Sequence, residues 1–339
     1  MLTAIWAILI FCILILIHEF GHFITAKLSG MTVHEFSLGM GPKIIGFSTK
    51  NTTYSLRLLP IGGYVKLEGE DGDSFDANAF CNKSFLKRFA VLFAGAFMNI
   101  LLGFFIFTII YSSVGSIASN RVESIIASSA FEEAGIKEGD KIIRMEGKKY
   151  SSSVRSYRDI SVFISLNGED TSTITFDRNG KIFKKDITPK YNADENRTLY
   201  GFSPSYQELT FSSSIYHAFW QCIFVIKSVF WSIGALISGL VPASSMSGPV
   251  AIVNEIGSAA KEGWETVLNF AGFISVNLGV MNLLPIPALD GGRILFLLIE
   301  KIRGKKMKSE HEGFINFVFF VLLIILMIVV TFSDISKLI

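Results

Sequence analysis

The sequence predicts a polytopic α-helical membrane protein with four transmembrane helices, a cytoplasmic, membrane-associated β-hairpin region and one extracytoplasmic β-rich domain. Three observations predict this fold class. Hydrophobic residues make up 50% of the 339 residues and charged residues only 18%, which is too apolar for a soluble globular protein. Four apolar runs reach the length of about 20 residues that a bilayer span requires. A long polar stretch between the second and third runs alternates apolar and polar residues, as strands do.

Composition excludes several other classes of protein. The 31 basic residues nearly balance the 29 acidic ones, so we expect no nucleic-acid partner. Cys12, Cys81 and Cys222 lie far apart and form no C-x-x-C pair, which argues against a disulfide framework and against a zinc knuckle. The lipid bilayer is therefore the first partner that the sequence predicts.

Each predicted span is an apolar run of bilayer length. The first has no basic residue before it and no small-residue cleavage site after it, so we interpret it as a transmembrane helix rather than a signal peptide. The last is apolar throughout, as a lipid-facing helix would be. The first and third end on polar residues, which need an explanation. The predicted spans are residues 2–24, 89–112, 267–289 and 314–332.

Basic residues near the span ends predict the orientation. The connection 25–88 and the short loop expected after the third span are rich in Lys and Arg, which favours the cytoplasm for both. The two termini and the segment from about 113 to 266 then lie outside the cell. The polar ends of the first and third spans both approach the cytoplasmic face, so they can meet.

The hairpin region is predicted over residues 41–68. Apolar and polar stretches alternate there around the turn-forming residues Asn51 and Gly62-Gly63, which indicates short strands. Two interpretations stay open: a plain surface hairpin, or a hairpin that dips into the membrane beside the polar helix end. Backbone at that depth is tolerated only where protein covers it or where it lines a wet cavity.

Between the second and third spans we expect strands followed by one apolar helix. Residues 120–205 alternate as strands do, with a tight turn at Asn179-Gly180. Residues 212–240 are apolar enough for a fifth span, but a fifth crossing would reverse the third span and separate the two polar ends. We therefore expect this run to lie outside or at the membrane interface.

These expectations divide the chain into four parts. Residues 1–114 hold the first half of the membrane core, and 115–208 form the extracytoplasmic domain. Residues 209–266 form the membrane-associated helical segment, and 267–339 hold the second half of the core.

The motif HEFGH at residues 18–22 carries the clearest chemistry. Positions i and i+4 share a helix face, so His18 and His22 can present imidazole nitrogens to one metal ion, while Glu19 can reach a metal-bound water. Ionisable side chains at the centre of a bilayer cost about 3 kcal/mol each and mark a function by default. The alternative is a hydrated interfacial helix end in which Glu19 pairs with Lys27.

A catalytic zinc normally has three protein ligands and one open position, so a third ligand must come from elsewhere. Asp290 is the candidate. In NLLPIPALDGGR, at 282–293, it follows two prolines that break the helix and precedes two glycines that let the backbone turn tightly. The alternative is a surface salt bridge between Asp290 and Arg293.

The face of the second span that carries Gly95, Asn99 and Gly103 has the spacing of a helix contact. Small residues four positions apart permit the close approach of a neighbouring helix. We interpret all three as packing residues rather than catalytic ones.

Seven motifs together resemble the site-2 protease family of intramembrane zinc metalloproteases, of the bacterial regulator-of-sigma-E protease type. The resemblance runs through most of the chain, and it departs from the family pattern at Ala96, where a proline is usual. The motifs are HEFGH (18–22), FSLGMGPKI (36–44), PIGGYVK (60–66), AGAFMNILLG (94–103), AGIKEGDKIIRMEG (134–147), SGPVAI (247–252) and NLGVMNLLPIPALDGGR (277–293).

The resemblance implies one Zn²⁺ per chain, bound by His18, His22 and Asp290, with Glu19 as the catalytic acid and base. It implies that Asn282 positions substrate or stabilises the oxyanion; an interhelical hydrogen bond is the alternative role. Gly62, Gly63 and Tyr64 of the hairpin are the expected substrate-binding residues there. It also implies that the extracytoplasmic domain is PDZ-like, with Gly201 and Phe202 in the peptide-binding loop or, alternatively, at a simple strand end.

The same resemblance implies the biological setting. The enzyme would lie in the bacterial plasma membrane, with both termini and the PDZ-like domain outside and the active site towards the cytoplasm. Its substrate would be a single-pass membrane protein, such as an anti-sigma factor already trimmed by an upstream site-1-type protease, or a remnant signal peptide. Two rival functions are a catalytically silent scaffold and a zinc transporter. The complete ligand set argues against the first. The second would need a continuous polar pathway, but the second and fourth spans contain few ionisable groups.

Overall fold

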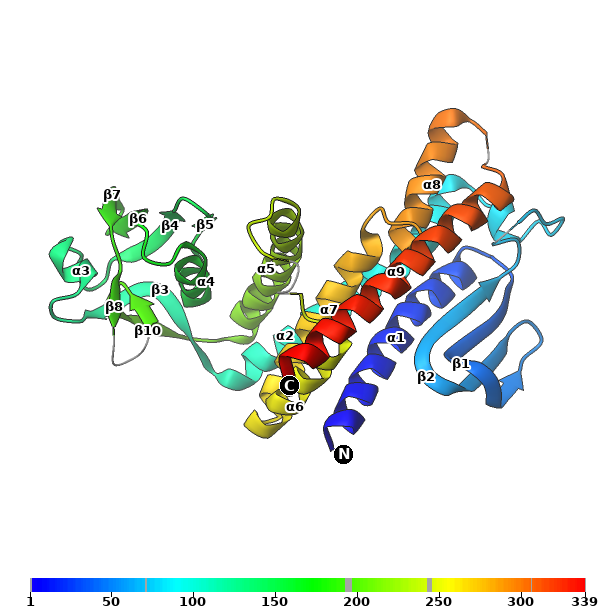
Figure 1. Ribbon diagram of the computed structural model, residues 1–339, viewed down its shortest axis with the longest axis horizontal. Coiled ribbons are helices and arrows are strands. Elements are labelled where there is room, and N and C mark those ends of the chain that lie inside the picture. The colour runs from blue at the N-terminus through cyan, green and yellow to red at the C-terminus, as the bar shows by residue number, and fades with distance from the viewer. Residues whose placement is uncertain (1, 71, 193–196, 243–245, 306, 339) are drawn as a thin grey trace. The chain divides into compact units, whose positions relative to one another are not determined.

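The computed structural model describes residues 2–70, 72–192, 197–242, 246–305 and 307–338 (Figure 1). Its contacts divide the chain into two compact units. The first, which we call the helical unit, comprises Met1–Ile110 and Ile215–Ile339. The second, the β-rich unit, comprises Tyr111–Ser214.

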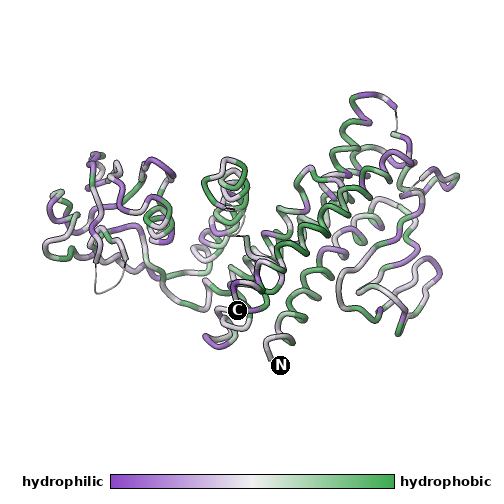
Figure 2. Tube along the Cα trace, in the orientation of Figure 1, coloured by the Kyte–Doolittle hydropathy of each residue, from purple (hydrophilic) through white to green (hydrophobic). Residues whose placement is uncertain are grey.

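Long apolar helices dominate the helical unit. Five of the described helices have the length and composition of a membrane span, one more than the sequence predicted, and the additional one is α5. Figure 2 shows the apolar colouring along these helices. The five span-like helices are α1 (Leu2–Leu28), α2 (Phe85–Val114), α5 (Phe211–Ile237), α7 (Trp264–Leu283) and α9 (Ser309–Leu338). Two shorter α-helices, α6 (Pro249–Glu262) and α8 (Asp290–Arg303), and a short 3-10 helix η1 at Phe80–Asn82 complete the described helices of this unit.

The segment after α7 differs from the prediction. We expected a short basic loop there, but α8 is a helix of 14 residues. Its apolar side chains recur at helical spacing, and Leu297 is buried against the end of α1 and the start of α2. Of the basic residues that favoured a loop, Lys301 and Arg303 lie exposed in the last turn of this amphipathic helix.

The hairpin is longer than predicted. It consists of β1 (Val33–Ser48) and β2 (Thr53–Leu67), and Asn51 lies in the connection between them, as expected. The prediction of a second turn at Gly62-Gly63 was wrong, because both glycines lie inside β2. Leu38 of β1 pairs with both Gly63 and Leu56, so β2 bends around β1 and the positive φ of Gly62 accommodates the bend.

The β-rich unit is built on a sheet in the order β10-β3-β4-β6-β7, with β5 beside β4. Its core is a cluster of large apolar side chains that includes Phe131, Phe163 and Phe176. The turn at Asn179-Gly180 joins β6 to β7 with positive φ at both residues, which confirms the predicted hairpin. The elements are β3 (Ser116–Ile125), α3 (Ala130–Glu133), β4 (Lys141–Glu146), β5 (Ser151–Ser153), α4 (Tyr157–Asn167), β6 (Ser172–Arg178), β7 (Lys181–Ile187), β8 (Lys190–Asn192), β9 (Arg197–Leu199) and β10 (Phe202–Glu208).

Candidate metal centre

The two histidines of HEFGH lie near the C-terminal end of α1, inside the candidate span Ile5–Leu28. One helical turn separates them, so their rings project from the same face. The Nε2 atoms of His18 and His22 are 3.2 Å apart. Both side chains are mostly buried, with 12% and 13% of their surface exposed.

Asp290 completes a triangle with these nitrogens. It is the first residue of α8, and its Oδ2 lies 3.1 Å from the Nε2 of His18 and 3.3 Å from the Nε2 of His22. The geometry does not favour the alternative that paired Asp290 with Arg293, because the carboxylate of Asp290 faces the two imidazoles and the guanidinium of Arg293 contacts the carboxylate of Glu70. The structure therefore brings together the three ligand candidates from opposite ends of the sequence.

The triangle has the dimensions of a zinc site. Tetrahedral zinc with ligands at 2.0–2.1 Å places its ligand atoms about 3.3 Å from one another. The three observed edges are 3.1, 3.2 and 3.3 Å. The Oδ2 of Asp290 is buried and lacks a hydrogen bond of regular geometry among the described residues. The donor set of two imidazoles and one carboxylate can thus hold one metal ion and leave a fourth position open.

Glycines let α2 approach α1 closely enough to support the histidine rings. A Cβ atom on Gly95 would lie 2.3 Å from the Nε2 of His22, and one on Gly21 would lie 2.5 Å from the carbonyl oxygen of Ala94. The same approach brings the Nδ1 of His22 within 2.8 Å of the carbonyl oxygen of Val91. Because Nδ1 is occupied by this hydrogen bond, Nε2 is the nitrogen that faces the triangle.

A tight turn between α7 and α8 sets the direction of Asp290. Ala288 has φ of +74°, a strained conformation for a residue with a Cβ, and its backbone nitrogen donates to Asn316 of α9. Gly291 and Gly292 let the first turn of α8 pack against the backbone of the preceding turn, where a Cβ would come within 2.1 and 2.4 Å of carbonyl oxygens.

Two ion pairs hold α8 in place. The guanidinium of Arg88 in α2 donates to both carboxylate oxygens of Glu300, at 2.9 and 3.0 Å, and the second pair joins Arg293 to Glu70. Our sequence interpretation missed the Arg88–Glu300 pair, since the two residues are 212 positions apart and no local pattern connects them.

The catalytic candidates Glu19 and Asn282 are placed differently. The side chain of Glu19 packs against β2, because a Cβ on Gly63 would lie 2.9 Å from its Cγ. Lys27, the alternative partner of Glu19, donates instead to the hydroxyl of Thr52 at 2.6 Å. Asn282 is half-buried in the last turn of α7 and is not part of the triangle.

The hairpin residues Gly62, Gly63 and Tyr64 lie along β2, which packs against α1. Tyr64 is half-buried, and its ring lies 5.2 Å from the guanidinium of Arg57. Arg57 also donates to Glu35 at 2.8 Å. Although burial opposes ionisation of Glu35, hydrogen bonds from Ser55 and Arg57 lower its pKa to about 2, so the two strands are joined by an ion pair at neutral pH.

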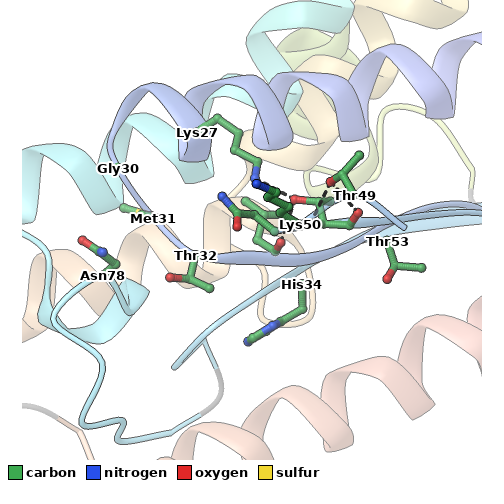
Figure 3. A pocket seen from close by; sticks show the side chains of 12 residues that line it. Lys27, Gly30, Met31, Thr32, His34, Thr49, Lys50, Thr53 and Asn78 are labelled. Carbon is green, nitrogen blue, oxygen red and sulfur yellow. Dashed lines mark hydrogen bonds between the residues drawn. The ribbon is translucent and has the colours of Figure 1, made fainter. Parts of the chain in front are cut away.

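A polar cavity of about 690 Å³ lies at the C-terminal end of α1, beside the hairpin (Figure 3). Lys27 and Gly30 of the helix end, His34 of β1 and the turn residues Thr49 and Lys50 line it. It contains none of the triangle residues, and Lys27 is engaged with the hairpin as described above.

Gly201 and Phe202 lie in the β-rich unit at the start of the edge strand β10. Gly201 has φ of +80°, and a Cβ there would lie 2.1 Å from the Cβ of Ser129. The ring of Phe202 stacks on Phe131 at 5.0 Å and meets the edge of Tyr157 at 5.9 Å. Phe202 is therefore packed against the core of this unit.

Comparisons with known proteins give this geometry a context. The profile of Peptidase family M50 matches residues 6–326. A Clostridium acetobutylicum protein, provisionally named a zinc metalloprotease, is 43% identical over 330 residues that cover 97% of this chain and 96% of that protein. The regulator of sigma-W protease RasP of Bacillus subtilis is 30% identical, and the aligned region covers 99% of each chain.

One solved structure, the PDZ domain of the SdrC-like protein from Listeria monocytogenes, aligns with 25% of this chain and 84% of that domain, at 19% identity and a TM-score of 0.22. The family assignment rests on the profile and on the relatives aligned over nearly their whole length, and not on this structure. They show that the chain belongs to peptidase family M50, the site-2 protease family, as a multi-pass membrane metalloprotease whose metal is zinc.

Proposed function

We propose that this zinc metalloprotease cleaves single-pass membrane proteins within or beside their transmembrane segments, with His18, His22 and Asp290 as the zinc ligands. The observation that carries the proposal is the equilateral arrangement of the two Nε2 atoms and the Oδ2 atom at the end of an apolar helix. Burial of the ionisable side chains of His18, His22 and Asp290 beside such a helix end is costly unless they serve a function.

Each residue of the site has one role in peptide hydrolysis. His18, His22 and Asp290 would hold the zinc ion, which would supply a Lewis acid that activates water near neutral pH. Glu19 accepts a proton from the attacking water on its side-chain carboxylate and returns it to the departing amine. Asn282 donates from its side-chain amide to the oxyanion that develops on the peptide carbonyl.

The strand β2 is the proposed docking edge for substrate. A helical substrate hides its peptide bonds in internal hydrogen bonds, so cleavage requires an extended stretch. Gly62, Gly63 and Tyr64 offer backbone groups to such a stretch, and the packing of Gly63 against Glu19 supports this position. An added strand there would pass beside the carboxylate that transfers the proton.

The site geometry supports four crossings of the membrane. The triangle lies near the C-terminal end of α1 and just beyond the C-terminal end of α7, so α1 and α7 cross in the same direction, and α2 supplies the return between them. A single crossing by α5 would reverse α7. α6 has only 14 residues, too few for the about 20 of a second compensating span. We therefore keep α5 at the external membrane surface and both termini and the β-rich unit outside, with the site towards the cytoplasm.

The β-rich unit is proposed to be PDZ-like and to select substrates. β10 lies at the edge of the sheet that the described residues form, so we expect its outer side to accept a peptide strand. The left-handed Gly201 at its start would leave backbone amides directed at a terminal carboxylate, with Phe202 as the apolar floor.

The name of the Bacillus subtilis relative, regulator of sigma-W protease, supports an anti-sigma factor as the substrate class. Such a substrate would reach the site after an upstream protease had removed its external part. Remnant signal peptides are the second candidate, since they also are single membrane helices with a short external end.

The proposal is tested with Glu19→Gln and His18→Ala in the full-length chain, assayed on a single-pass reporter in lipid vesicles. Glu19→Gln should lower the cleavage rate about 10²–10⁴-fold with the zinc content unchanged, since it removes only the proton acceptor. His18→Ala should lose both zinc and cleavage. A Glu19→Gln enzyme that cleaves at the wild-type rate would refute the catalytic role, and full zinc binding by His18→Ala would refute the ligand set.

A further inference from the structure

Asn99 of α2 lies beside the metal triangle, on the side of His18 that faces away from Asp290. We infer that Asn99 is a positioning residue that accepts the Nδ1 proton of His18 and so presents the unprotonated Nε2 to the metal. The inference rests on the proposed function, because it concerns one of the proposed zinc ligands. It changes the interpretation of Asn99 from a packing residue to part of the support of the site.

A neutral imidazole carries one proton, and only the nitrogen without it can bind a metal. The Nε2 atoms of His18 and His22 face the triangle, so both Nδ1 atoms must carry the proton and each needs an acceptor. For His22 the acceptor is the carbonyl oxygen of Val91, at 2.8 Å. For His18 the side-chain amide of Asn99 lies 3.4 Å from Nδ1.

The amide of Asn99 is free to act as that acceptor. The side chain is completely buried, and its Oδ1 has no hydrogen-bond partner among the described residues. The Nδ2 atom is the one that faces His18, but half a turn of the amide exchanges the positions of oxygen and nitrogen. With Nδ2 towards Nδ1 the ring would have to carry its proton on Nε2, which is incompatible with a bound metal. Metal binding at His18 therefore favours the orientation in which Oδ1 accepts.

The backbone of Asn99 is held in place from the opposite side. The hydroxyl of Ser275, a completely buried residue of α7, donates to the carbonyl oxygen of Asn99 at 2.6 Å. On either side of Asn99 along the same helix, Gly95 leaves room for His22 and Gly103 leaves room for Val276. The amide is thus fixed between α1 and α7, where a small shift of α2 would change its distance to His18.

A packing role and an acceptor role of Asn99 predict opposite rankings of zinc affinity for two variants. Leu has the same branched arrangement of heavy atoms as Asn, with bulkier methyl groups and no acceptor, whereas Asp keeps an acceptor but adds a charge. If Asn99 only packs, Leu should be tolerated and the buried charge of Asp should be harmful. If Asn99 accepts from Nδ1, Asp should be tolerated, because a carboxylate is a common partner of metal-binding histidine, and Leu should be harmful.

The experiment measures the zinc affinity of the full-length protein by competition with a chromogenic chelator, together with the melting temperature of the zinc-free protein. Asn99→Leu should weaken zinc binding about 10–100-fold, the usual effect of removing such a partner. Asn99→Asp should bind zinc at least as tightly as wild type. Thr108→Val is the matched control on α2, because the hydroxyl of Thr108 donates to the carbonyl of Phe104 one helical turn before it and to no other described residue, and its zinc affinity should not change.

Each outcome decides one question. Wild-type zinc affinity in Asn99→Leu, or equal losses in Asn99→Leu and Asn99→Asp, would overturn the inference. If Asn99→Leu does not fold, as its melting temperature would reveal, Asn99→Ala carries the same expectation. If His18→Ala also retains zinc, the ligand set of the proposed function is wrong. If His18→Ala loses zinc while Asn99→Leu keeps it, only the role of Asn99 is wrong.

Discussion

In the helical unit, Gly21, Gly95 and Gly279 lie at helix crossings, where a Cβ would come within 2.3–2.7 Å of an atom of the neighbouring helix. In the β-rich unit, Gly135, Gly139 and Gly180 lie in turns with positive φ and no atom near the position of a Cβ. The first group supplies space between helices, and the second supplies backbone conformations.

The difference reflects how each unit is held together. Large apolar side chains such as Phe131 and Phe176 fill the core of the β-rich unit, and Gly135, Gly139 and Gly180 lie in its turns, although Gly201 also leaves room for Ser129. Between helices in a bilayer the lipid is as apolar as the side chains, and close backbone packing replaces hydrophobic burial. In the helical unit the close packing of α1 against α2 also supports the metal triangle.

Gly95→Ala should therefore produce the largest effect on the site. The added methyl overlaps the ring of His22, and forcing an extra carbon into a packed site costs about 1–3 kcal/mol, equivalent to a loss of up to about 100-fold in zinc affinity if the ring moves away. Zinc affinity and reporter cleavage should fall together, and both are measurable on the full-length protein.

The matched control is Gly313→Ala in α9. This glycine is also helical, but no atom lies near the position of its Cβ. Alanine there should leave zinc affinity unchanged and stabilise the helix slightly, by about 0.5–1 kcal/mol. Equal zinc affinities for Gly95→Ala and wild type would show that the ring of His22 does not depend on the crossing.

The local part of this site could be predicted from the sequence. HEFGH fixes the spacing of His18 and His22 on one helix face, and the two prolines and two glycines around Asp290 indicate a broken helix end. The support around them could not be predicted, because Asn99, Ser275 and Val91 meet the site only after α2 packs between α1 and α7. Such long-range contacts leave no periodic pattern in the sequence.

The hairpin shows the same limit on a smaller scale. Asn51 was correctly predicted as a turn, because turn chemistry is local. Gly62-Gly63 carries the same local signal, but the pair lies inside β2, where the strand bends and packs against Glu19. A glycine pair thus marks either a turn or a close approach, and only the neighbouring helix decides between them.

The buried acids of the two units extend the comparison. Asp140 of the β-rich unit is fully buried, and its carboxylate accepts two hydrogen bonds from Arg178, both at 2.7 Å, and one from the backbone of Lys137 at 2.9 Å. Asp290 of the helical unit faces two imidazoles instead, with no regular hydrogen bond to its Oδ2 among the described residues. The first acid has its partners within its own fold, whereas the second has the donor geometry of a metal ligand.

Asp140 should make the β-rich unit sensitive to acid. Burial alone would raise its pKa, but Arg178 and the Lys137 backbone lower it below the usual value of 3.8. A depressed pKa contributes stability above the unfolded value and loses it as the pH falls through the folded pKa. Hydrogen-exchange protection of β4 and β6 should therefore be constant from pH 7 to 5 and fall below about pH 4.

Asp140→Asn should remove this acid sensitivity and cost about 2 kcal/mol at pH 7, since hydrogen bonds to a charged group are worth about 1.5–3 kcal/mol. Protection factors in β4 and β6 measure the loss, and zinc affinity should be unchanged. An Asp140→Asn protein with the same acid transition as wild type would assign that transition to another carboxyl group.

Gly180→Ala should have the smallest effect and the most local one. Its φ of +85° belongs to the turn between β6 and β7, and alanine in this left-handed region costs about 1 kcal/mol. Exchange protection in β6 and β7 should fall about fivefold, which corresponds to that energy. Asn179→Gly is the control, because glycine keeps the positive φ at the neighbouring turn position.

The zinc affinity of Gly180→Ala should stay at the wild-type value, because Gly180 supplies a conformation and no space at a helix crossing. A loss of zinc affinity as large as that of Gly95→Ala would contradict the division of roles between the two groups of glycines.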